Sequence, residues 1–415
     1  MNRMKLGEIL SVKHGWAFKG EYFAEDGEQS ILTPGNFFEK GGFKPNNGKE
    51  RYYTGTYPKE YLCHKGDLIV AMTQQAEGLL GSTALVPENN KYLHNQRIGL
   101  ITCDEKRLNK LFAYYLFMTK SVREQLERSS SGTKVKHTSP EKIYDVEVEI
   151  PDVISQQKIA NLLWFIDEKI ANNNAINDNL QQQAILLYDY WFTQFDFPDA
   201  NGKPYYSSGN KMTWNNQLKK NIPLSWKVKP LKAICEICLG GTPSTTVSKY
   251  WNGSISWLNS GEIAQFPVVS SEKKITQLGL ENSPTKLMSK NTTVISITGN
   301  IRASILALDA CANQSVVGIL ENEIFKSPFI YQNMLRLLKH YTSISTGNCQ
   351  KHISKGAIEE SLVCIPDSIV LKQYYSLSEP IYKQMHEIAL ENQHLTELHD
   401  WLLPMLMNGQ VTIKD

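Results

Sequence analysis

Two short segments of the 415-residue chain combine side chains that suit contact with nucleic acid. Residues 129–137, SSSGTKVKH, and residues 343–352, SISTGNCQKH, share small residues, hydroxyl groups, lysine and a final histidine. Serine and threonine can donate hydrogen bonds to phosphate oxygens, whereas asparagine and glutamine can pair with base edges. We interpret both segments as candidate DNA-contacting loops, in which His137 and His352 either bind phosphate or have a structural role.

Polar residues of other loops extend these candidates over both halves of the chain. We expect the lysines to contact phosphates and the amide and guanidinium groups to contact bases. In the first half the candidates are Gln74, Gln75, Arg97, Thr133, Lys134 and Lys136. In the second half they are Asn259, Asn300, Arg302, Asn348, Gln350, Lys351 and Lys355.

The two candidate loops belong to a unit that occurs twice in the chain. Residues 131–137, SGTKVKH, match residues 346–352, TGNCQKH, and each histidine lies 14 residues before a Pro-Asp pair, at 151–152 and at 366–367. The offset of 215 continues without gaps into a helical segment. Because such a period is far too long for a solenoid, it indicates two homologous domains, each followed by its own helix.

The sequence therefore predicts a mixed α+β protein with a pseudo-two-fold internal repeat. Two α/β globules, each built from short apolar strands such as 67–72 and 293–298 and one helix (108–126 and 328–338), alternate with long helices. The expected segments are a first globule at 1–150, a first long helix at 151–194, a linker rich in Gly, Pro, Ser and Asn at 195–228, a second globule at 229–367 and a second long helix at 368–415.

Apolar residues spaced alternately by four and three define a coiled-coil seam in both long helices. Each seam has an asparagine at the same position, Asn177 and Asn392. A buried asparagine costs stability but fixes the register, so we expect these two to pair with each other, the alternative being exposure at a frayed point. The predicted seam comprises Ile166, Ile170, Asn177, Leu180, Leu187, Ile381, Met385, Asn392, Leu395 and Leu402.

The long helices are expected to act as a spacer. At ~1.5 Å per residue, the stretch from Ile154 to Trp191 reaches ~57 Å, and antiparallel pairing would place one globule at each end. Pro380 is expected in the first turn of the second helix, because a proline deeper in a helix would break it.

Charge is segregated along the chain in the same way in both repeats. Residues 106–142 contain nine basic and three acidic residues, and residues 326–355 contain five basic residues and none that is acidic. The helical arms are acidic, with two basic and seven acidic residues in 150–200 and three and nine in 356–415. Lysine and arginine supply the sequence-independent part of DNA affinity, whereas acidic arms are expected to face protein.

Motifs for catalysis and for metal binding are missing or isolated. There is no Gly-x-x-x-x-Gly-Lys-Ser/Thr loop and no Asn-Pro-Pro-Tyr-like tetrapeptide of adenine methyltransferases. Cys235 and Cys238 lack the second pair that a zinc site needs and are expected to pack in the core. Pro-Asp at 151–152 followed by Asp-Glu-Lys at 167–169 resembles a nuclease pattern, but the repeat replaces Asp167 by Tyr382.

Overall composition is that of an ordinary globular protein, with 41% hydrophobic and 21% charged residues. No run of some 18 apolar residues suggests a membrane span, and the N-terminus lacks the features of a secretory signal. Seven scattered cysteines suit reduced thiols, so we expect a cytoplasmic protein. The net charge of +2 excludes no class of function.

Two globules that each precede a coiled-coil helix already suggest a likeness to a known protein family. Local motifs strengthen this likeness. Residues 240–245, GGTPST, 250–257, YWNGSISW, and 275–280, ITQLGL, look like the opening of a target-recognition domain, and residues 12–23, VKHGWAFKGEYF, are similar to a variant of it. Over essentially its whole length the chain resembles the specificity subunits of type I restriction–modification enzymes.

The resemblance implies two target-recognition domains, held apart by antiparallel helices, that each recognise one half of a bipartite, asymmetric sequence in double-stranded DNA. It implies as partners two methyltransferase subunits, which use S-adenosylmethionine, and restriction subunits with ATP- and Mg-dependent translocase and nuclease activity. No catalytic residue, cofactor or membrane contact is expected in this chain itself.

Two other functions remain open at this stage. The chain could be a coiled-coil scaffold that binds proteins and not DNA, which a DNA gel shift would decide. It could also be a nuclease that uses Asp152 and Asp167, which metal-dependent cleavage by the isolated chain would reveal.

Overall fold

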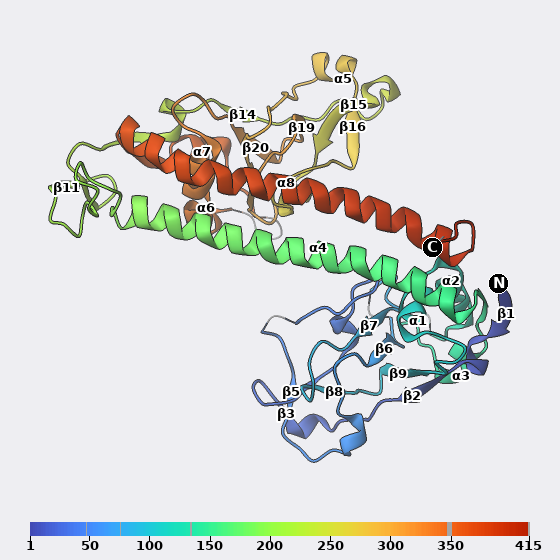
Figure 1. The fold of residues 1–415 in the computed structure, drawn as a ribbon. Coiled ribbons are helices and arrows are strands. Elements are labelled where there is room, and N and C mark those ends of the chain that lie inside the picture. The colour runs from blue at the N-terminus through green and yellow to red at the C-terminus, as the bar shows by residue number, and fades with distance from the viewer. Residues whose placement is uncertain (47, 75, 133–134, 347–350, 414–415) are drawn as a thin grey trace. The chain divides into compact units, whose positions relative to one another are not determined.

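The computed structural model describes the chain in five stretches, which are residues 1–46, 48–74, 76–132, 135–346 and 351–413. The chain divides into two compact units, Met1–Lys169 with Leu395–Asp415, and Ile170–His394. Each unit contains one of the two globules and a part of each long helix (Figure 1). The compact units therefore end within the long helices and not at the ends of the expected segments.

A four-stranded antiparallel sheet forms the centre of the globule in the first unit. Its inner strand β6 pairs with β9 through Leu68 and Ile101 and with β7 through Leu68 and Leu85. All four residues of β6 are buried, which agrees with the apolar strand expected near 67–72. In sheet order the strands are β2 (Leu10–His14), β9 (Ile98–Cys103), β6 (Leu68–Ala71) and β7 (Thr83–Leu85).

The globule in the second unit has a sheet of the same topology. In both sheets the strands follow the chain order first, fourth, second, third, and all neighbours are antiparallel. This shared order confirms the internal repeat. The strands are β14 (Ile237–Leu239), β20 (Val316–Ile319), β17 (Thr293–Ser296) and β18 (Ala303–Ile305).

Each globule contains a further sheet with one parallel pair, β4 with β8 and β15 with β19. A two-stranded ladder then joins the start of each globule to its end, β1 with β10 and β13 with β21, so that the chain leaves directly into a long helix. These strands are β1 (Asn2–Lys5), β3 (Phe23–Ala24), β4 (Ser30–Ile31), β5 (Tyr52–Tyr53), β8 (Tyr92–Leu93), β10 (Glu147–Ile150), β13 (Lys227–Pro230), β15 (Trp251–Leu258), β16 (Lys273–Ile275), β19 (Ala310–Ala312) and β21 (Leu362–Ile365).

The shorter helices differ in part from the expected ones. The single helix expected at 108–126 is two helices, because the chain leaves helical geometry after Phe117 and a new helix starts after Thr119. The helix expected at 328–338 extends to Ile344. These helices are α1 (Lys110–Leu116), α2 (Lys120–Ser129), α3 (Pro140–Tyr144), α5 (Gln277–Glu281), α6 (Ser327–Ile344) and α7 (Lys355–Glu359).

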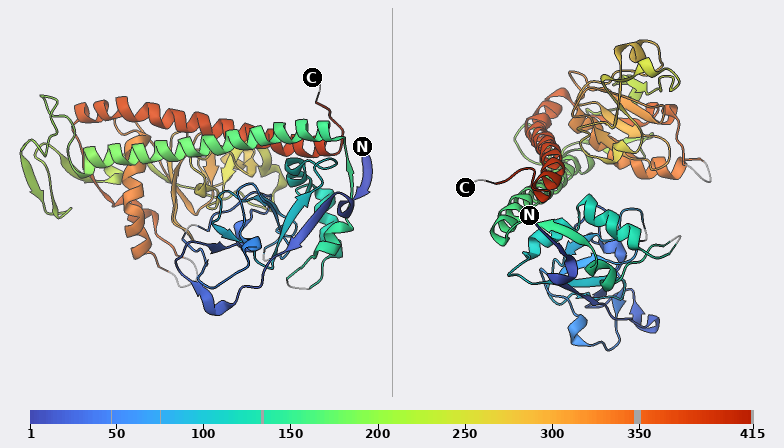
Figure 2. Two further views of the ribbon diagram at one scale, coloured as in Figure 1. Left: turned by 60° about the horizontal axis from the view of Figure 1, so that its bottom comes forward. Right: turned by 90° about the vertical axis from the view of Figure 1, so that its right-hand side faces the viewer.

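The long helices α4 (Val153–Tyr188) and α8 (Ser368–Met407) lie side by side within each unit (Figure 2). In the second unit, Asn173 Nδ2 donates to Asn392 Oδ1 at 2.8 Å, and the rings of Tyr188 and Tyr374 are 6.3 Å apart. Because the partner's residue number falls as that of α4 rises, the helices run antiparallel there.

The expected seam residues are buried or half-buried in both helices. Leu180 and Ala184 of α4 pack in one cluster with Tyr382, Met385 and Ile388 of α8. The remaining predicted positions that are buried or half-buried are Ile166, Ile170, Asn177, Leu187, Ile381, Asn392, Leu395 and Leu402.

The expected pairing of Asn177 with Asn392 is wrong. Asn392 accepts a hydrogen bond from Asn173 and donates one to Asn174 Oδ1 at 2.8 Å, whereas Asn177 is buried and its Oδ1 has no partner among the described residues. The cause is the antiparallel geometry. The repeat equivalent of the Asn173–Asn392 contact is Asn177 opposite Ile388, so equivalent residues lie at symmetric positions without touching each other.

The expected position of Pro380 in a first turn is also wrong, because α8 begins at Ser368 and the proline lies inside it. A proline in a helix removes one backbone hydrogen bond. Pro380 is exposed, while Tyr375 and Tyr382 on either side of it are buried. We attribute the continuity of α8 to this packing on both sides of the proline, which outweighs the local cost.

The segment expected as a linker at 195–228 contains regular structure. Strands β11 (Met212–Asn215) and β12 (Lys220–Pro223) form an antiparallel hairpin. Phe197 and Trp226 are buried and stack with ring centroids 5.0 Å apart. Aromatic residues bury large apolar areas, so this segment folds onto the core of the second unit despite its many turn-forming residues.

Each unit has its own large apolar core. In the first, Phe112 and Tyr115 of α1 are fully buried against Leu163 of α4. In the second, Phe329 of α6 and Tyr374 of α8 are buried in the same cluster. Over the described ranges, no helix is both long and apolar enough to cross a membrane.

Candidate nucleic-acid interface

In the first unit, three polar loops meet where strand β6 ends. The N–H of Met72 donates to the carbonyl of Arg97 at 3.0 Å, and the N–H of Gln74 donates to the carbonyl of Lys136 at 2.9 Å. Thr73 Oγ1 lies 3.1 Å from His137 Nδ1. Backbone bonds therefore hold three candidates, Gln74, Arg97 and Lys136, at one end of the sheet.

The second unit repeats this arrangement at the end of strand β17. The N–H of Gly299 donates to the carbonyl of Lys351 at 2.8 Å, and Thr298 Oγ1 lies 3.1 Å from His352 Nδ1. The N–H of Arg302 donates to Ser296 Oγ at 2.9 Å, and the same hydroxyl donates to the carbonyl of Asn300. This end of the sheet thus gathers Asn300, Arg302 and Lys351.

The Thr–His contact orients each histidine ring at the base of its candidate loop. His137 also forms a β-bridge with Ser131, as His352 does with Thr346, so the described ends of each segment are paired with each other. The recurrence of the same contact in both repeats favours a structural role for these Nδ1 atoms.

Some candidates are less suited to DNA contact than the sequence suggested. Lys136 forms an ion pair with Glu127, and Lys355 pairs with Glu359 at 2.8 Å within α7. Asn259 lies in the turn after β15, where its Oδ1 accepts a hydrogen bond from the N–H of Gly261. The candidates that lie outside the described residues are Gln75, Thr133, Lys134, Asn348 and Gln350.

A glycine at the same place in each repeat lets the first strand approach the loop that carries the Asn-Gln pair. A Cβ on Gly15 would lie 2.1 Å from the carbonyl oxygen of Asn95, and a Cβ on Gly240 would lie 2.1 Å from that of Asn313. Such a distance is far below any van der Waals contact, so only glycine fits there.

A cavity of about 530 Å³ opens beside Arg97 in the first unit, and we call it the Arg97 cavity. Its cationic lining residues, Lys49, Arg51 and Arg97, are exposed and form no ion pair with the described part of the chain, and no described carboxylate lines it. Its polar and apolar lining residues are Phe18, Phe23, Ile31, Thr33, Pro34, Asn46, Asn95 and Gln96.

Sequence reasoning did not single out Asn46, Lys49 and Arg51, which line this cavity. They lie in the loop before β5, whose sequence KPNNGKER holds three basic residues and one acidic residue. This local excess of positive charge was the available signal. It was weaker than the two basic stretches, which recur at matching positions in both repeats.

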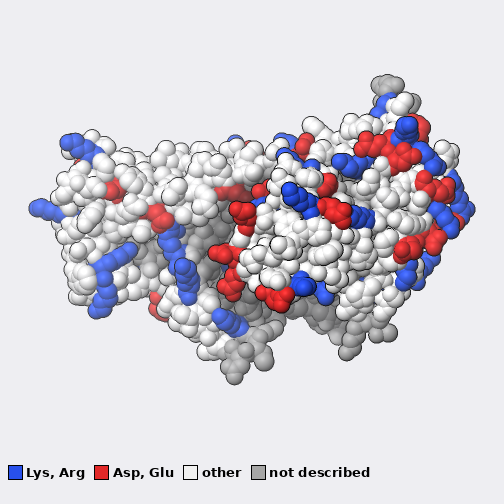
Figure 3. Space-filling view, turned by 90° about the horizontal axis from the view of Figure 1, so that it is seen from below, with Lys and Arg blue, Asp and Glu red and all other residues white. Residues whose placement is uncertain are grey.

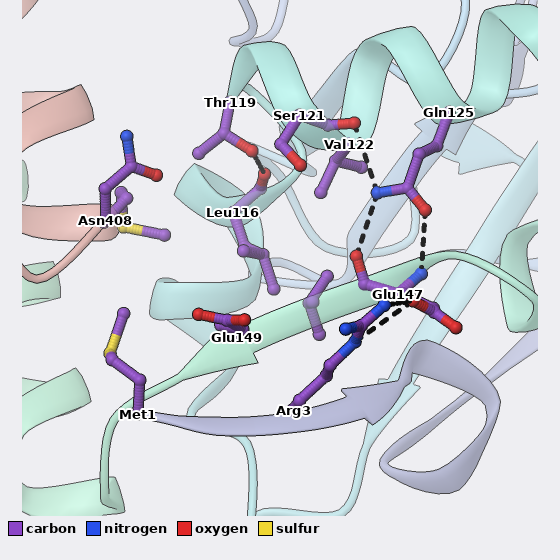
Figure 4. Close-up of a pocket in the computed structure, with 12 residues that line it drawn as sticks. Met1, Arg3, Leu116, Thr119, Ser121, Val122, Gln125, Glu147, Glu149 and Asn408 are labelled. Carbon is purple, nitrogen blue, oxygen red and sulfur yellow. Dashed lines mark hydrogen bonds and ion pairs between the residues drawn. The ribbon is translucent and has the colours of Figure 1, made fainter.

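A second cavity of the first unit, of about 430 Å³, has a different character (Figure 4). Arg3 forms an ion pair with Glu147, and Gln125 both donates to the carbonyl of Glu147 and accepts from its N–H, each at 2.9 Å. The carboxylate of Glu149 adds further negative charge to the lining. Arg3, Gln125 and Glu147 are thus bonded to one another, and the two carboxylates would repel phosphate.

The loop that follows β6 is held in place by a buried arginine. Arg123 of α2 donates to the carbonyls of Phe117, Gly78 and Leu80 at 2.6 to 2.9 Å. No carboxylate of the described chain pairs with it, and burial lowers its pKa to about 10. Arg123 therefore positions the backbone of residues 78–80 and is not available to DNA.

Charge by itself does not outline a binding surface on the side of the molecule drawn in Figure 3. On the face drawn in Figure 3, lysine and arginine side chains are interspersed with aspartate and glutamate. The Arg97 cavity is distinguished from such mixed surface because its cations have no acidic neighbours in the lining.

The carboxylates of the nuclease-like pattern have structural partners. Asp152 accepts hydrogen bonds from the N–H and hydroxyl of Ser155 at the start of α4. Asp167 accepts one from Tyr115 at 2.6 Å, and burial raises the pKa of Asp167. Fifteen residues along a helix span about 22 Å, so the two carboxylates cannot share a metal ion. Cys235 and Cys238 are buried in two separate clusters, as the core interpretation predicted.

Comparisons with known proteins agree with this arrangement. The family model for the type I restriction modification DNA specificity domain matches residues 1–182 and 223–386. The chain is 26% identical to the MjaIX specificity subunit of Methanocaldococcus jannaschii over 311 residues, which are 73% of this chain and 69% of that protein. It is 20% identical to the HindI specificity subunit of Haemophilus influenzae over 355 residues, 72% of this chain and 77% of that protein.

The fold is also shared with a solved structure. The S subunit of a type I restriction–modification system from M. genitalium superposes with a TM-score of 0.62 at 16% identity, covering 98% of this chain and 96% of that one. This likeness shows the fold.

Proposed function

The chain belongs to the type I restriction–modification DNA specificity family, and from this premise we propose that it recognises a bipartite, asymmetric DNA target. Each globule contacts one half of the target through the polar loops at the end of its central strand. The chain thereby directs the methylation and restriction activities of partner subunits to that sequence.

One observation supports this proposal above the others, namely that the same backbone scaffold presents different side chains in the two repeats. The Thr73–His137 and Thr298–His352 contacts are equal in length, yet Gln74 stands where the second repeat has Gly299. Two equal scaffolds with unlike polar residues suit two unlike half-sites.

Selection of duplexes from a random library by the complete chain tests this function. We expect enrichment of a motif with two fixed halves and a gap between them. Replacement of residues 1–150 by those of a relative should change one half and leave the other intact. No enriched motif, or a change in both halves, would contradict the proposal.

Catalysis is assigned to other subunits. The support within this chain is the structural engagement of Asp152 and Asp167, which leaves neither as half of a paired carboxylate site. We propose that S-adenosylmethionine, ATP and Mg²⁺ are used by partner subunits only, and that the chain, with its free cysteines at described positions such as Cys63, works in the cytoplasm. Methyl transfer by the rigorously purified chain alone would contradict this assignment.

Matched apolar positions on the long helices suit two copies of one partner. In the first unit Ile154 and Trp401 are 72% and 53% exposed, and their equivalents in the second unit, Ile369 and Leu186, are 69% and 67% exposed. Exposed apolar groups of this size favour burial against protein. We assign them to two methyltransferase subunits, which the restriction subunits then join.

The number of bound copies tests this assignment. Changing Ile154 and Trp401 to serine should remove one of two methyltransferase copies in mass measurements of the assembled complex. The pair Ile369→Ser and Leu186→Ser should remove the other. Two copies retained in both double variants would contradict the assignment.

A further inference from the structure

Two equivalent glutamines of the repeats are in different states. Gln96 follows Asn95, and Gln314 follows Asn313. The hydroxyl of Thr242 donates to Gln314 Oε1 at 2.6 Å, which ties this side chain to its own globule.

The first repeat has no such tie. The N–H of Trp16 bonds to the carbonyl of His94, just as the N–H of Gly241 bonds to that of Ala312. The residue after Trp16 is Ala17, which has no hydroxyl group where the second repeat has Thr242. Accordingly, the exposed side chain of Gln96 makes no hydrogen bond to the described part of the chain.

The surroundings of Gln96 are basic. It lines the Arg97 cavity together with Arg97, Lys49 and Arg51, and the amide of Asn46 lies in the same lining. An exposed amide in the company of cations without acidic neighbours combines the two kinds of contact that DNA recognition needs, since cations bind phosphate and an amide can bond to a base edge.

From this difference we infer that Gln96 is a specificity-determining residue of the first repeat and contacts a base pair in the major groove of duplex DNA. Its carboxamide can donate and accept at once, which matches the paired donor and acceptor on the major-groove edge of adenine. Lys49 and Arg51 contact the neighbouring phosphates. In the second repeat Gln314 is bonded to Thr242, so another residue of that repeat contacts the base pair there. The inference rests on the proposed function and makes it specific to one residue.

The test uses the complete chain, a library of random DNA duplexes and four variants. The unaltered chain first selects its motif from the library. Gln96→Ala should then lose about tenfold or more of its preference at one base pair of one half-site and retain the other half-site. Ala17→Thr provides a hydroxyl like that of Thr242, so it should weaken the preference at the same base pair without removing any side chain that contacts DNA.

The other two variants separate base contact from phosphate contact. Arg51→Ala should weaken binding on all sequences and reduce the slope of log affinity against log salt by about 0.9. Lys65→Ala is the matched control, because Lys65 is an exposed cation of the same globule before β6 begins, whereas the Arg97 cavity lies where β6 ends. It should change neither the preference nor the salt slope.

The outcomes distinguish a failure of the proposed function from a failure of the inference about Gln96. If the unaltered chain selects no motif, the proposed function fails. If it selects a bipartite motif and Gln96→Ala selects the same motif with equal stringency, the inference about Gln96 fails while the proposed function stands. If Arg51→Ala leaves the salt slope unchanged, the inferred contact of Arg51 with phosphate is contradicted. Thermal unfolding of each variant shows that it is folded.

Discussion

The two repeats agree in their backbone and differ in the side chains that this backbone presents. Both have the same strand order, a glycine packed against the carbonyl of an asparagine, and a Thr–His contact at the base of the candidate loop. They differ at the glutamine, because Gln96 lines a basic cavity while Gln314 is bonded to Thr242.

A similar exchange occurs where each globule meets its long helix. Tyr115 of α1 donates to Asp167 of α4, whereas Gln332 of α6 donates to Tyr382 of α8, and Asp167 and Tyr382 are equivalent positions. The donor and acceptor types change while the connected positions stay the same. The two repeats thus share their backbone contacts and differ in their polar side chains. These side-chain differences indicate how the two halves differ in function.

The largest expected effect comes from breaking the shared backbone contact. Gly15→Ala forces a Cβ into the carbonyl of Asn95 and should lower the free energy of unfolding of the first unit by about 3 kcal/mol, since a backbone atom must move. Gly240→Ala should do the same in the second unit. Hydrogen exchange resolved by unit measures both.

Gly20→Ala is the control for this pair, because nothing lies within 4 Å of its added Cβ. If Gly15→Ala and Gly20→Ala have equal effects, the close approach of Gly15 to Asn95 does not constrain the fold.

Acid should destabilise both units through one buried histidine each. Burial lowers the pKa of His94 in the first unit and of His386 in the second to about 4. Because the unfolded chain binds a proton near pH 6.5 and the folded chain does not until about 4, stability is full above 6.5 and falls between these values, by about 2 kcal/mol per histidine at pH 5.

Alanine is the natural choice of substitution for both histidines, because the other repeat has alanine at each equivalent position. Ala312 corresponds to His94, and Ala171 corresponds to His386. His94→Ala should flatten the pH dependence of the first unit only, and His386→Ala that of the second only, when hydrogen exchange is compared at pH 7 and pH 5. An unchanged slope in the matching unit would show that the histidine is not responsible.

A smaller effect should distinguish the two contacts between globule and helix. Tyr115→Phe removes the hydrogen bond to Asp167, a carboxylate whose pKa is already raised by burial, and should cost about 1.5 kcal/mol. Tyr382→Phe removes only a neutral hydrogen bond with Gln332 and should cost about 1 kcal/mol. Denaturant unfolding followed by hydrogen exchange measures both, and a larger loss for Tyr382→Phe would reverse the interpretation.

The repeat and the helical seam could be predicted from the sequence, because both are periodic. The offset of 215 residues and the four-three spacing needed no knowledge of three-dimensional contacts. The Arg97 cavity could not be predicted in the same way. It joins Lys49 and Arg51 to Gln96 and Arg97, which lie more than 40 residues away in the chain, and only tertiary folding brings these loops together.

Where the structure departs from local sequence preferences, the reasons are physical. Local preference placed Pro380 at a helix start, but burial of Tyr375 and Tyr382 on either side maintains the helix through it. Turn-forming residues suggested a linker at 195–228, but Phe197 and Trp226 pack it against the core. In both cases long-range packing overrides a local rule.

The smallest expected effects break the apparent equality of the two seam asparagines. Asn392→Leu should cost about 0.5 to 1 kcal/mol, because it leaves the buried side chain of Asn173 without one of its partners and also removes the bond to Asn174. Asn177→Leu should instead raise stability by up to about 1 kcal/mol, because Asn177 Oδ1 is buried without a partner among the described residues and lies opposite apolar packing around Ile388. Hydrogen exchange of the second unit measures both changes. If the two variants lower the free energy of unfolding equally, the asparagines are equivalent in energy as well as in sequence. The antiparallel register then offers no reason to distinguish them.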